Sequence, residues 1–286
     1  MLTTRSVEDA VRAALAEDAP WGDVTAELAI PAEANLAARL VARERGVFAG
    51  GMLVREAFRQ ADPRIAVNAL VDDGARFDSG DVLAEISGPA RGILTAERVA
   101  LNFSQRLSGI ATLTDRFVSS VAGSRARIAD TRKTTPGLRV FEKHAVRAGG
   151  GMNHRFSLSD AVMVKDNHLA ALGANDDATT TAALHALRDR VGHTTAIIVE
   201  VDRLDQVEAV AKANVTGILL DNFELADLKA AVGVVGGRAV CEASGGIDLA
   251  TVRDIAATGV DVISVGQLTH GARALDLGLD AVDGHG

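Results

Sequence analysis

A repeated unit in the C-terminal half most strongly constrains the fold of this 286-residue chain. Four apolar runs begin at positions 196, 217, 239 and 262, which are 21 to 23 residues apart, and two more span Arg127–Asp130 and Ala161–Lys165. Helical patterns separate the later runs, at 181–190, 203–212, 224–232 and 248–257. Strands buried on both faces read as continuous apolar runs, and their alternation with helices predicts a parallel sheet. Six such repeats favour a closed or nearly closed (β/α) barrel over an open doubly wound sheet.

The N-terminal half has a different pattern. A helix is expected from about Ser6, which is the predicted N-cap. Strand-like alternation at 36–48 and 65–71 indicates a small α/β domain, and a helical pattern from Thr95 to about Val121 links it to the barrel. The segment Gly80–Gly88 resembles a biotinyl or lipoyl carrier hairpin, but a carrier needs a lysine at the hairpin tip. Since no lysine precedes Lys133, a scaffold hairpin is the preferred interpretation.

Charge is distributed unevenly along the chain. Residues 125–168 contain nine Lys and Arg against four Asp and Glu, a local net charge of +5, although the whole chain carries −8. The overall negative charge and the 3% aromatic content argue against binding of nucleic acid, which requires a basic face or stacking rings. A basic cluster on an acidic protein instead suggests a small, highly anionic ligand. With one cysteine, no signal peptide and no apolar run long enough for a bilayer, a cytoplasmic protein without membrane contact is expected.

Polar residues follow the apolar runs, where barrel enzymes build their active sites. These strand-end residues are Asp130, Arg132 and Lys133, Lys165 and Asp166, Glu200 and Asp202, Asp221 and Asn222, Glu242 and Ser244, and Gly266. The segment Thr131–Thr134 is the predicted centre of an anion site. Glu200 and Asp221 could together hold Mg²⁺, which takes one or two carboxylates and completes its shell with water and phosphate oxygens. The alternative is that both are ion-pair acceptors for nearby lysines.

Glycine-rich turns supply two further features. Ser244-Gly245-Gly246 and Gly266-Gln267 end the last two strands, where barrels bind phosphate, although such glycines also serve simple turns. Three glycines precede His154 and Arg155, and arginine suits planar carboxylates through paired hydrogen bonds. Lys165 has a rival interpretation, because Schiff-base aldolases place their nucleophilic lysine at the end of an apolar strand.

Taken in order, the motifs of the chain resemble those of the quinolinate phosphoribosyltransferase family. They are Leu94–Arg98, Leu107–Ala111, Thr131–Arg139, Lys143–Arg155, Lys165–His168, Glu200–Asp202, Leu220–Asn222, Ser244–Gly246 and Val265–Gly266. The resemblance covers nearly the whole chain. It implies the fold of type II phosphoribosyltransferases, an N-terminal α/β sandwich (1–110) and an incomplete (β/α) barrel (111–274), with a tail from about 275 to 286 that packs back on the sandwich.

The resemblance also implies roles for individual residues. Arg132, Arg155 and Lys165 would hold the carboxylates of quinolinate, with His154 nearby, and Arg98 would enter the active site of the partner in a homodimer or higher assembly. The residues assigned to phosphoribosyl pyrophosphate and its Mg²⁺ are Thr131, Lys133, Glu200, Asp221, Ser244, Gly245, Gly246, Gly266, Gln267 and His270. Lys133, Glu200 and Asp221 would be catalytic.

The implied reaction forms nicotinate mononucleotide, pyrophosphate and CO₂ in de novo NAD synthesis. The ring nitrogen of quinolinate is already a nucleophile, so the protein chiefly has to manage charge. Four alternatives share part of this pattern: nicotinate phosphoribosyltransferase, a related paralogue found near molybdate-transport genes, a Schiff-base aldolase and a non-catalytic phosphate-binding barrel. The paired acids Glu200 and Asp221 argue against the last two.

Overall fold

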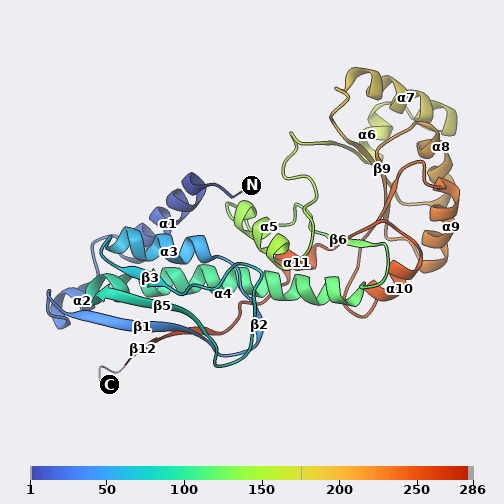
Figure 1. Cartoon of the computed structure of the whole chain (residues 1–286). Helices are drawn as coiled ribbons and strands as arrows, with labels where there is room; N and C mark the ends of the chain where they lie inside the picture. The colour runs from blue at the N-terminus through green and yellow to red at the C-terminus, as the bar shows by residue number, and fades with distance from the viewer. Residues whose placement is uncertain (1, 175, 283–286) are drawn as a thin grey trace. The chain divides into compact units, whose positions relative to one another are not determined.

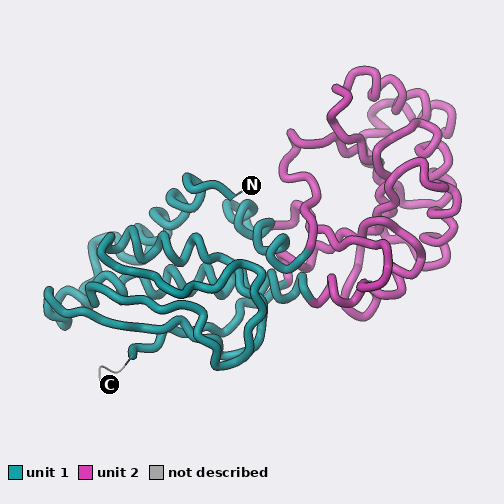
Figure 2. The backbone as a smooth tube through the Cα atoms, viewed as in Figure 1, with its two compact units in different colours: residues 1–115, 135–150, 272–286 teal, residues 116–134, 151–271 magenta. Residues whose placement is uncertain are grey.

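The computed structural model describes residues 2–174 and 176–282, which form two compact units (Figure 2). Unit 1 comprises the chain up to Asp115, Thr135–Gly150 and the chain from Ala272 onward, and unit 2 comprises Arg116–Thr134 and Gly151–Gly271. The units are therefore interleaved in sequence. The domain boundaries expected from sequence, 1–110 and 111–274, remain a prediction. They do not include Thr135–Gly150 in the N-terminal domain, whereas these residues belong to unit 1.

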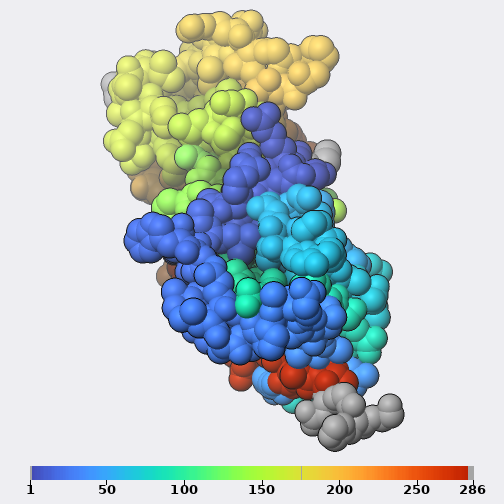
Figure 3. Space-filling view, turned by 90° about the vertical axis from the view of Figure 1, so that its left-hand side faces the viewer, coloured from blue at the N-terminus to red at the C-terminus, as the bar shows by residue number. Residues whose placement is uncertain are grey.

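Unit 1 contains an antiparallel sheet with the strand order β12-β1-β5-β3 (Figure 1). Its strands are β1 (Asn35–Ala42), β3 (Ala66–Asn68), β5 (Val82–Pro89) and β12 (Leu277–Ala281). Ala38, Leu40 and Ala42 are buried, because alternate residues of a strand point to one face. The C-terminal strand β12 pairs along β1, and Figure 3 shows the C-terminal residues (red) against the blue N-terminal surface. Of the expected tail, residues 283–286 lie outside the described residues.

The helices of unit 1 pack around this sheet and each other (Figure 1). They are α1 (Thr4–Asp18), α2 (Val24–Ala29), α3 (Gly51–Ala61), the first part of α4 (Ala90–Ser120) and α5 (Arg139–Ala148), and the short strands β2 (Gly46–Val47) and β4 (Arg76–Phe77) form a separate pair. The sequence predicted α4 five residues too short at its start. Within the described residues, no helix is both long and apolar enough to cross a membrane.

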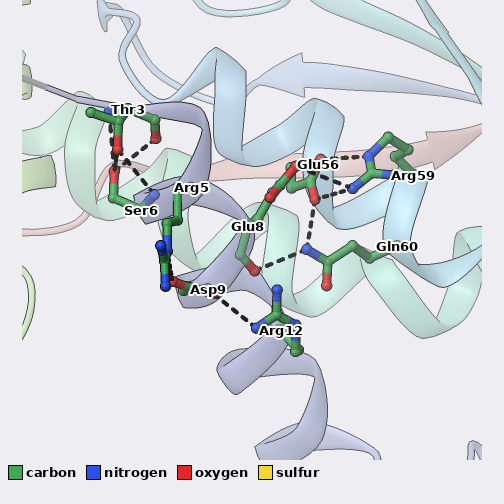
Figure 4. A network of polar contacts seen from close by, with 9 residues as sticks. All are labelled: Thr3, Arg5, Ser6, Glu8, Asp9, Arg12, Glu56, Arg59 and Gln60. Carbon is green, nitrogen blue, oxygen red and sulfur yellow. Dashed lines mark hydrogen bonds and ion pairs between the residues drawn. The ribbon is translucent and has the colours of Figure 1, made fainter.

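The N-terminal helix corrects one prediction. Its N-cap is Thr3 and not Ser6. The Thr3 hydroxyl accepts the Ser6 backbone N–H, and the Ser6 hydroxyl accepts the Thr3 backbone N–H, which makes a capping box. Both α1 and α3 contribute to the polar network in Figure 4, where Gln60 Nε2 donates to the Glu8 carbonyl at 2.9 Å and to Glu56 at 2.6 Å. The Arg59 guanidinium holds the pKa of Glu56 below its usual value.

Unit 2 contains a parallel sheet with the strand order β6-β11-β10-β9-β8-β7. The strands are β6 (Arg127–Ala129), β7 (Val162–Val164), β8 (Ile197–Val201), β9 (Gly217–Asp221), β10 (Val240–Ser244) and β11 (Val262–Ser264). The first strand pairs with the last, and the described residues form no ladder between β6 and β7. This gap makes the barrel incomplete, and the predicted fold class, an N-terminal α/β sandwich with an incomplete (β/α) barrel, is confirmed.

Helices alternate with the strands of unit 2, as the repeat predicted. They are α6 (Asp166–Ala171), α7 (Asp177–Arg190), the 3₁₀ turn η1 (Leu204–Gln206), α8 (Val207–Lys212), α9 (Leu225–Val235), α10 (Val252–Ala257) and α11 (Gln267–His270). Beside the gap, Met152 forms a parallel bridge with Ala129. The loop that follows this bridge carries His154 and Arg155, so the gap in the sheet is where these side chains enter the barrel.

Candidate active site

A cavity of about 810 Å³ lies within unit 2, at the carboxyl ends of the strands. Apart from Arg98, every residue assigned to the site from sequence lines it: Thr131, Arg132, Lys133, His154, Arg155, Lys165, Glu200, Asp221, Ser244, Gly245, Gly246, Gly266, Gln267 and His270. Arg98 is exposed on α4 in unit 1. The structure therefore gathers residues that are up to 139 positions apart in the chain, while their individual roles stay predictions.

Strand register explains why these side chains converge. Asp221 on β9 is level with Ser244 on β10, and Ser244 is level with Ser264 on β11. Glu200 on β8 is level with Leu219, two residues before Asp221. Because successive side chains of a strand alternate between faces, Leu219 and Asp221 point to the same side. The acidic and hydroxyl side chains thus form two adjacent rows along one wall of the cavity.

The cationic wall is made by Arg132 and Arg155. Burial, followed by the nearby charge of Arg132, lowers the pKa of Arg155 from its ordinary value. Within the described residues, the buried Nε of Arg132 has no hydrogen-bond partner. Two guanidiniums at close quarters, one with an unsatisfied donor, are costly in a protein interior unless an anion joins them. This wall is therefore built to receive a planar anion such as a carboxylate.

The acidic wall is made by Glu200 and Asp221. Lys165 Nζ lies 2.5 Å from Glu200 Oε2, and Asp221 Oδ2 accepts a hydrogen bond from Asn222 Nδ2 at 2.8 Å. No group of three or more His, Cys, Asp and Glu side chains among the described residues is arranged to hold a metal ion. Two cavity-lining carboxylates nevertheless suit Mg²⁺, which usually completes its shell with water and substrate oxygens.

The loop Thr131–Thr134 is fixed by local and distant contacts. Lys133 donates its backbone N–H to Thr131 Oγ1 at 3.0 Å, and the Thr269 hydroxyl donates to the Lys133 carbonyl at 2.6 Å. A Cβ at Gly266 would lie 3.0 Å from Lys133 Cδ and 3.2 Å from His270 Nε2. Glycine at this position therefore lets a lysine and a histidine approach the end of β11 together.

The chain just after this loop is anchored in unit 1. Glu142, whose side chain is fully buried, accepts the Thr135 backbone N–H at 3.0 Å and hydrogen bonds from the Thr135 hydroxyl and Arg106 Nη2, both at 2.8 Å. A buried carboxylate requires such donors. Glu142 thus holds the chain at the residue that directly follows Thr134.

Some strand-end residues do not reach the cavity. Asp130, Asp166, Asp202 and Asn222 are not among its lining residues, whereas Met163, Leu219, Glu242, Ile247, Asp248, Ser264 and Gly271 are. Ser264 was missed because one serine inside an apolar strand carries no chemical signal. The register of β10 and β11, which sets it beside Ser244, identifies it.

Comparison with known proteins identifies the family. The N-terminal domain of quinolinate phosphoribosyl transferase matches residues 23–108, and its C-terminal domain matches residues 110–280. The chain belongs to the quinolinate phosphoribosyltransferase family. It is therefore a pentosyltransferase, and its cavity lies within the residues that match the C-terminal domain.

Individual members of the quinolinate phosphoribosyltransferase family align with nearly the whole of this chain. A nicotinate-nucleotide pyrophosphorylase (carboxylating) of Mycobacterium leprae is 43% identical over 96% of this chain and 97% of its own. A quinolinate phosphoribosyltransferase (decarboxylating) of Nicotiana tabacum is 39% identical over 96% of this chain and 82% of its own. The solved structure of NadC from Streptococcus pyogenes superposes with a TM-score of 0.92, at 40% identity and 99% coverage of both chains.

Proposed function

We propose that this enzyme transfers the phosphoribosyl group of phosphoribosyl pyrophosphate to quinolinate and releases CO₂, which yields nicotinate mononucleotide and pyrophosphate for de novo NAD synthesis. The observation that carries this proposal is the division of one cavity into a cationic wall and an acidic wall. A dicarboxylate and a phosphorylated sugar could not share a cavity without both. A cytoplasmic location, with no nucleic acid or membrane partner, fits these small anionic substrates.

Arg132 and Arg155 are suited to the carboxylates of quinolinate. Their paired donors match a planar carboxylate, and the unpartnered Nε of Arg132 is a donor available for it. Lys165 adds a third cation on the same side, and His154 lies beside Arg155 in the same loop. The binding of two negative charges would relieve the repulsion between the guanidiniums.

Phosphoribosyl pyrophosphate would occupy the opposite part of the cavity. The turns at Ser244-Gly245-Gly246 and Gly266-Gln267, together with His270, lie after the last two strands, where barrels bind phosphate. Thr131 and Lys133 line the same cavity, and Lys133 would stabilise the negative charge that develops on the departing pyrophosphate. Glu200 and Asp221 would hold Mg²⁺, which when bound neutralises phosphate oxygens.

The residues present account for each stage of the reaction. The ring nitrogen of quinolinate attacks C1 of the ribose while the bond from C1 to the pyrophosphate oxygen breaks. Positive charge on the ribose faces the carboxylates of Glu200 and Asp221. The new pyridinium then withdraws electrons, so that the C2–carboxylate bond breaks, CO₂ departs and C2 takes a proton. No serine, cysteine or strong base is needed as a nucleophile.

A homodimer in which Arg98 enters the partner's cavity is supported by the surface around this residue. Arg91 and Thr95, two turns and one turn before Arg98 on α4, contact the α2 segment through the Ile30 carbonyl and the Asp23 side chain, respectively. The exposed apolar residues of this region are Trp21 (92%), Val24 (66%), Leu28 (83%) and Leu94 (37%). Exposed apolar groups around a cation are typical of a protein interface.

The proposal is tested by incubating the purified protein with quinolinate, phosphoribosyl pyrophosphate and Mg²⁺ and measuring nicotinate mononucleotide and CO₂ in equal amounts. Nicotinate in place of quinolinate is the matched control. Product from nicotinate and none from quinolinate would overturn the proposal.

A further inference from the structure

Two buried carboxylates outside the predicted binding set contact His154. Asp130 is fully buried, and its Oδ1 accepts the His154 backbone N–H at 2.8 Å. Glu242 is 5% exposed, and its Oε1 lies 3.4 Å from His154 Nε2 and accepts the Ser264 hydroxyl. Asp130 thus holds the backbone of His154, while Glu242 faces its ring.

The ring of His154 has a defined tautomer. The Arg155 backbone N–H donates to His154 Nδ1 at 2.7 Å, so Nδ1 serves as an acceptor and carries no proton. Nε2 is then the ring nitrogen that can carry a proton, and it lies 3.4 Å from Glu242 Oε1. The imidazole therefore lies between a buried carboxylate on β10, which is within ion-pair distance of Nε2 but makes no hydrogen bond with it, and the backbone N–H of Arg155, which Nδ1 accepts.

We infer that Glu242 is a positioning residue that fixes the ring of His154 and, through it, the point from which the Arg155 side chain extends. A buried carboxylate requires polar partners, and those of Glu242 among the described residues are the Ser264 hydroxyl, which donates to it, and His154 Nε2, which lies within ion-pair distance. The identity of the ligand that benefits, the carboxylate end of quinolinate, rests on the proposed function. Partners behind binding residues commonly change affinity about 10-fold to 100-fold.

The test is Glu242→Gln, which keeps the size of the side chain and removes its charge. We expect the KM for quinolinate to rise about tenfold while the KM for phosphoribosyl pyrophosphate stays within about twofold. In the substrate-free protein, ¹⁵N NMR of the His154 ring should show the Nε2–H tautomer in the wild type and a mixture in the variant, with the signals assigned by their loss in His154→Asn. A KM for phosphoribosyl pyrophosphate that rises as much as that for quinolinate, or an unchanged ring spectrum, would overturn the inference.

Two more variants keep the test decisive if Glu242→Gln does not fold. Ser264→Ala removes one donor but keeps the carboxylate, so the His154 tautomer should persist. Glu242→Asp keeps the charge but withdraws it by one methylene, so the KM for quinolinate should rise; an unchanged KM would count against the inference. The NMR measurement uses no substrate, so it tests the positioning role of Glu242 independently of activity. If the wild type fails to convert quinolinate, that result contradicts only the proposed function.

Discussion

Lys165 and Glu200 form an ion pair inside the cavity, with 2.5 Å between Lys165 Nζ and Glu200 Oε2. The pair joins the ends of β7 and β8 and so connects the cationic and acidic walls. The Glu200 carboxylate occupies the amino group of Lys165, and the chain belongs to a phosphoribosyltransferase family, which argues against the Schiff-base role that its strand-end position allowed. Borohydride with a keto substrate should therefore leave Lys165 unmodified.

We expect Lys165 and Glu200 to act as a unit. Lys165→Met and Glu200→Gln should each lower kcat/KM by at least about 100-fold. The double variant should be little less active than the less active of the two single variants, because the effects of residues that act together are not additive. The exposed pair Lys212 and Glu208, 3.6 Å apart on α8, is the matched control, and its neutral variants should stay within about twofold. Additive losses for the cavity pair would contradict this expectation.

Gly245→Ala should impair activity more than stability. A Cβ at this position would overlap Asn222 Oδ1 and lie 2.9 Å from the Asn222 backbone nitrogen, and Asn222 donates to Asp221. Since a shift of about 1 Å in a reacting group costs roughly 100-fold, we expect a loss of that size in kcat/KM. Gly123→Ala is the control: Gly123 also has a positive φ (+86°) but no neighbour within 4 Å. It should cost about 1 kcal/mol of stability and leave activity intact.

Metal dependence should be traceable to Asp221. Chelation with EDTA should abolish turnover and added Mg²⁺ should restore it. Asp221→Asn should raise the Mg²⁺ concentration for half-maximal activity about tenfold or more, because it removes a charged ligand. Asp202→Asn is the control, because Asp202 directly follows the neighbouring strand β8 but does not line the cavity. Full activity in EDTA would remove Mg²⁺ from the mechanism.

Mixed dimers test the role of Arg98. Arg98→Ala and Lys133→Ala should each be inactive alone, but a hybrid dimer has one cavity with Lys133 and the partner's intact arginine. Random exchange makes half of the dimers hybrid, so about a quarter of wild-type activity should return. If Arg98 served its own cavity, mixing would restore nothing.

Acid should weaken one contact in unit 1. The hydrogen bond from the Arg273 guanidinium lowers the pKa of Glu44 from 4.5 to about 2. Burial of Glu44 works in the opposite direction, and the hydrogen bond from the Asp276 backbone N–H lowers the pKa further. A lowered carboxyl pKa adds stability above the unfolded value of 4.5, and this is lost as pH falls toward 2. Glu44→Gln should cost about 1 kcal/mol at pH 7, a value kept small because Arg273 is 70% exposed. Urea unfolding of both proteins at pH 7 and 3.5 should show the difference shrinking, and a constant difference would contradict it.

The sequence predicted the location of the cavity because the carboxyl ends of parallel strands meet at one edge of a sheet. Glu200 and Asp221 could be placed by that rule alone, whereas His270 was assigned only through the family resemblance, since it lies in the short helix α11 beyond the last strand of the barrel. The contacts of Glu142 could not be predicted, because its partner Arg106 is 36 residues away on another helix. The same applies to Glu242, whose partners His154 and Ser264 are brought to it only by strand register and the loop beside β6.

The pairing of β12 with β1 has a consequence for the order of folding. In the sheet of unit 1, β1 lies between β5 and β12, yet β12 is synthesised more than 230 residues after β1. All of unit 2 is synthesised between these strands. We therefore expect the barrel strands to assemble on the nascent chain first, while the N-terminal sheet retains an open edge until β12 has been synthesised.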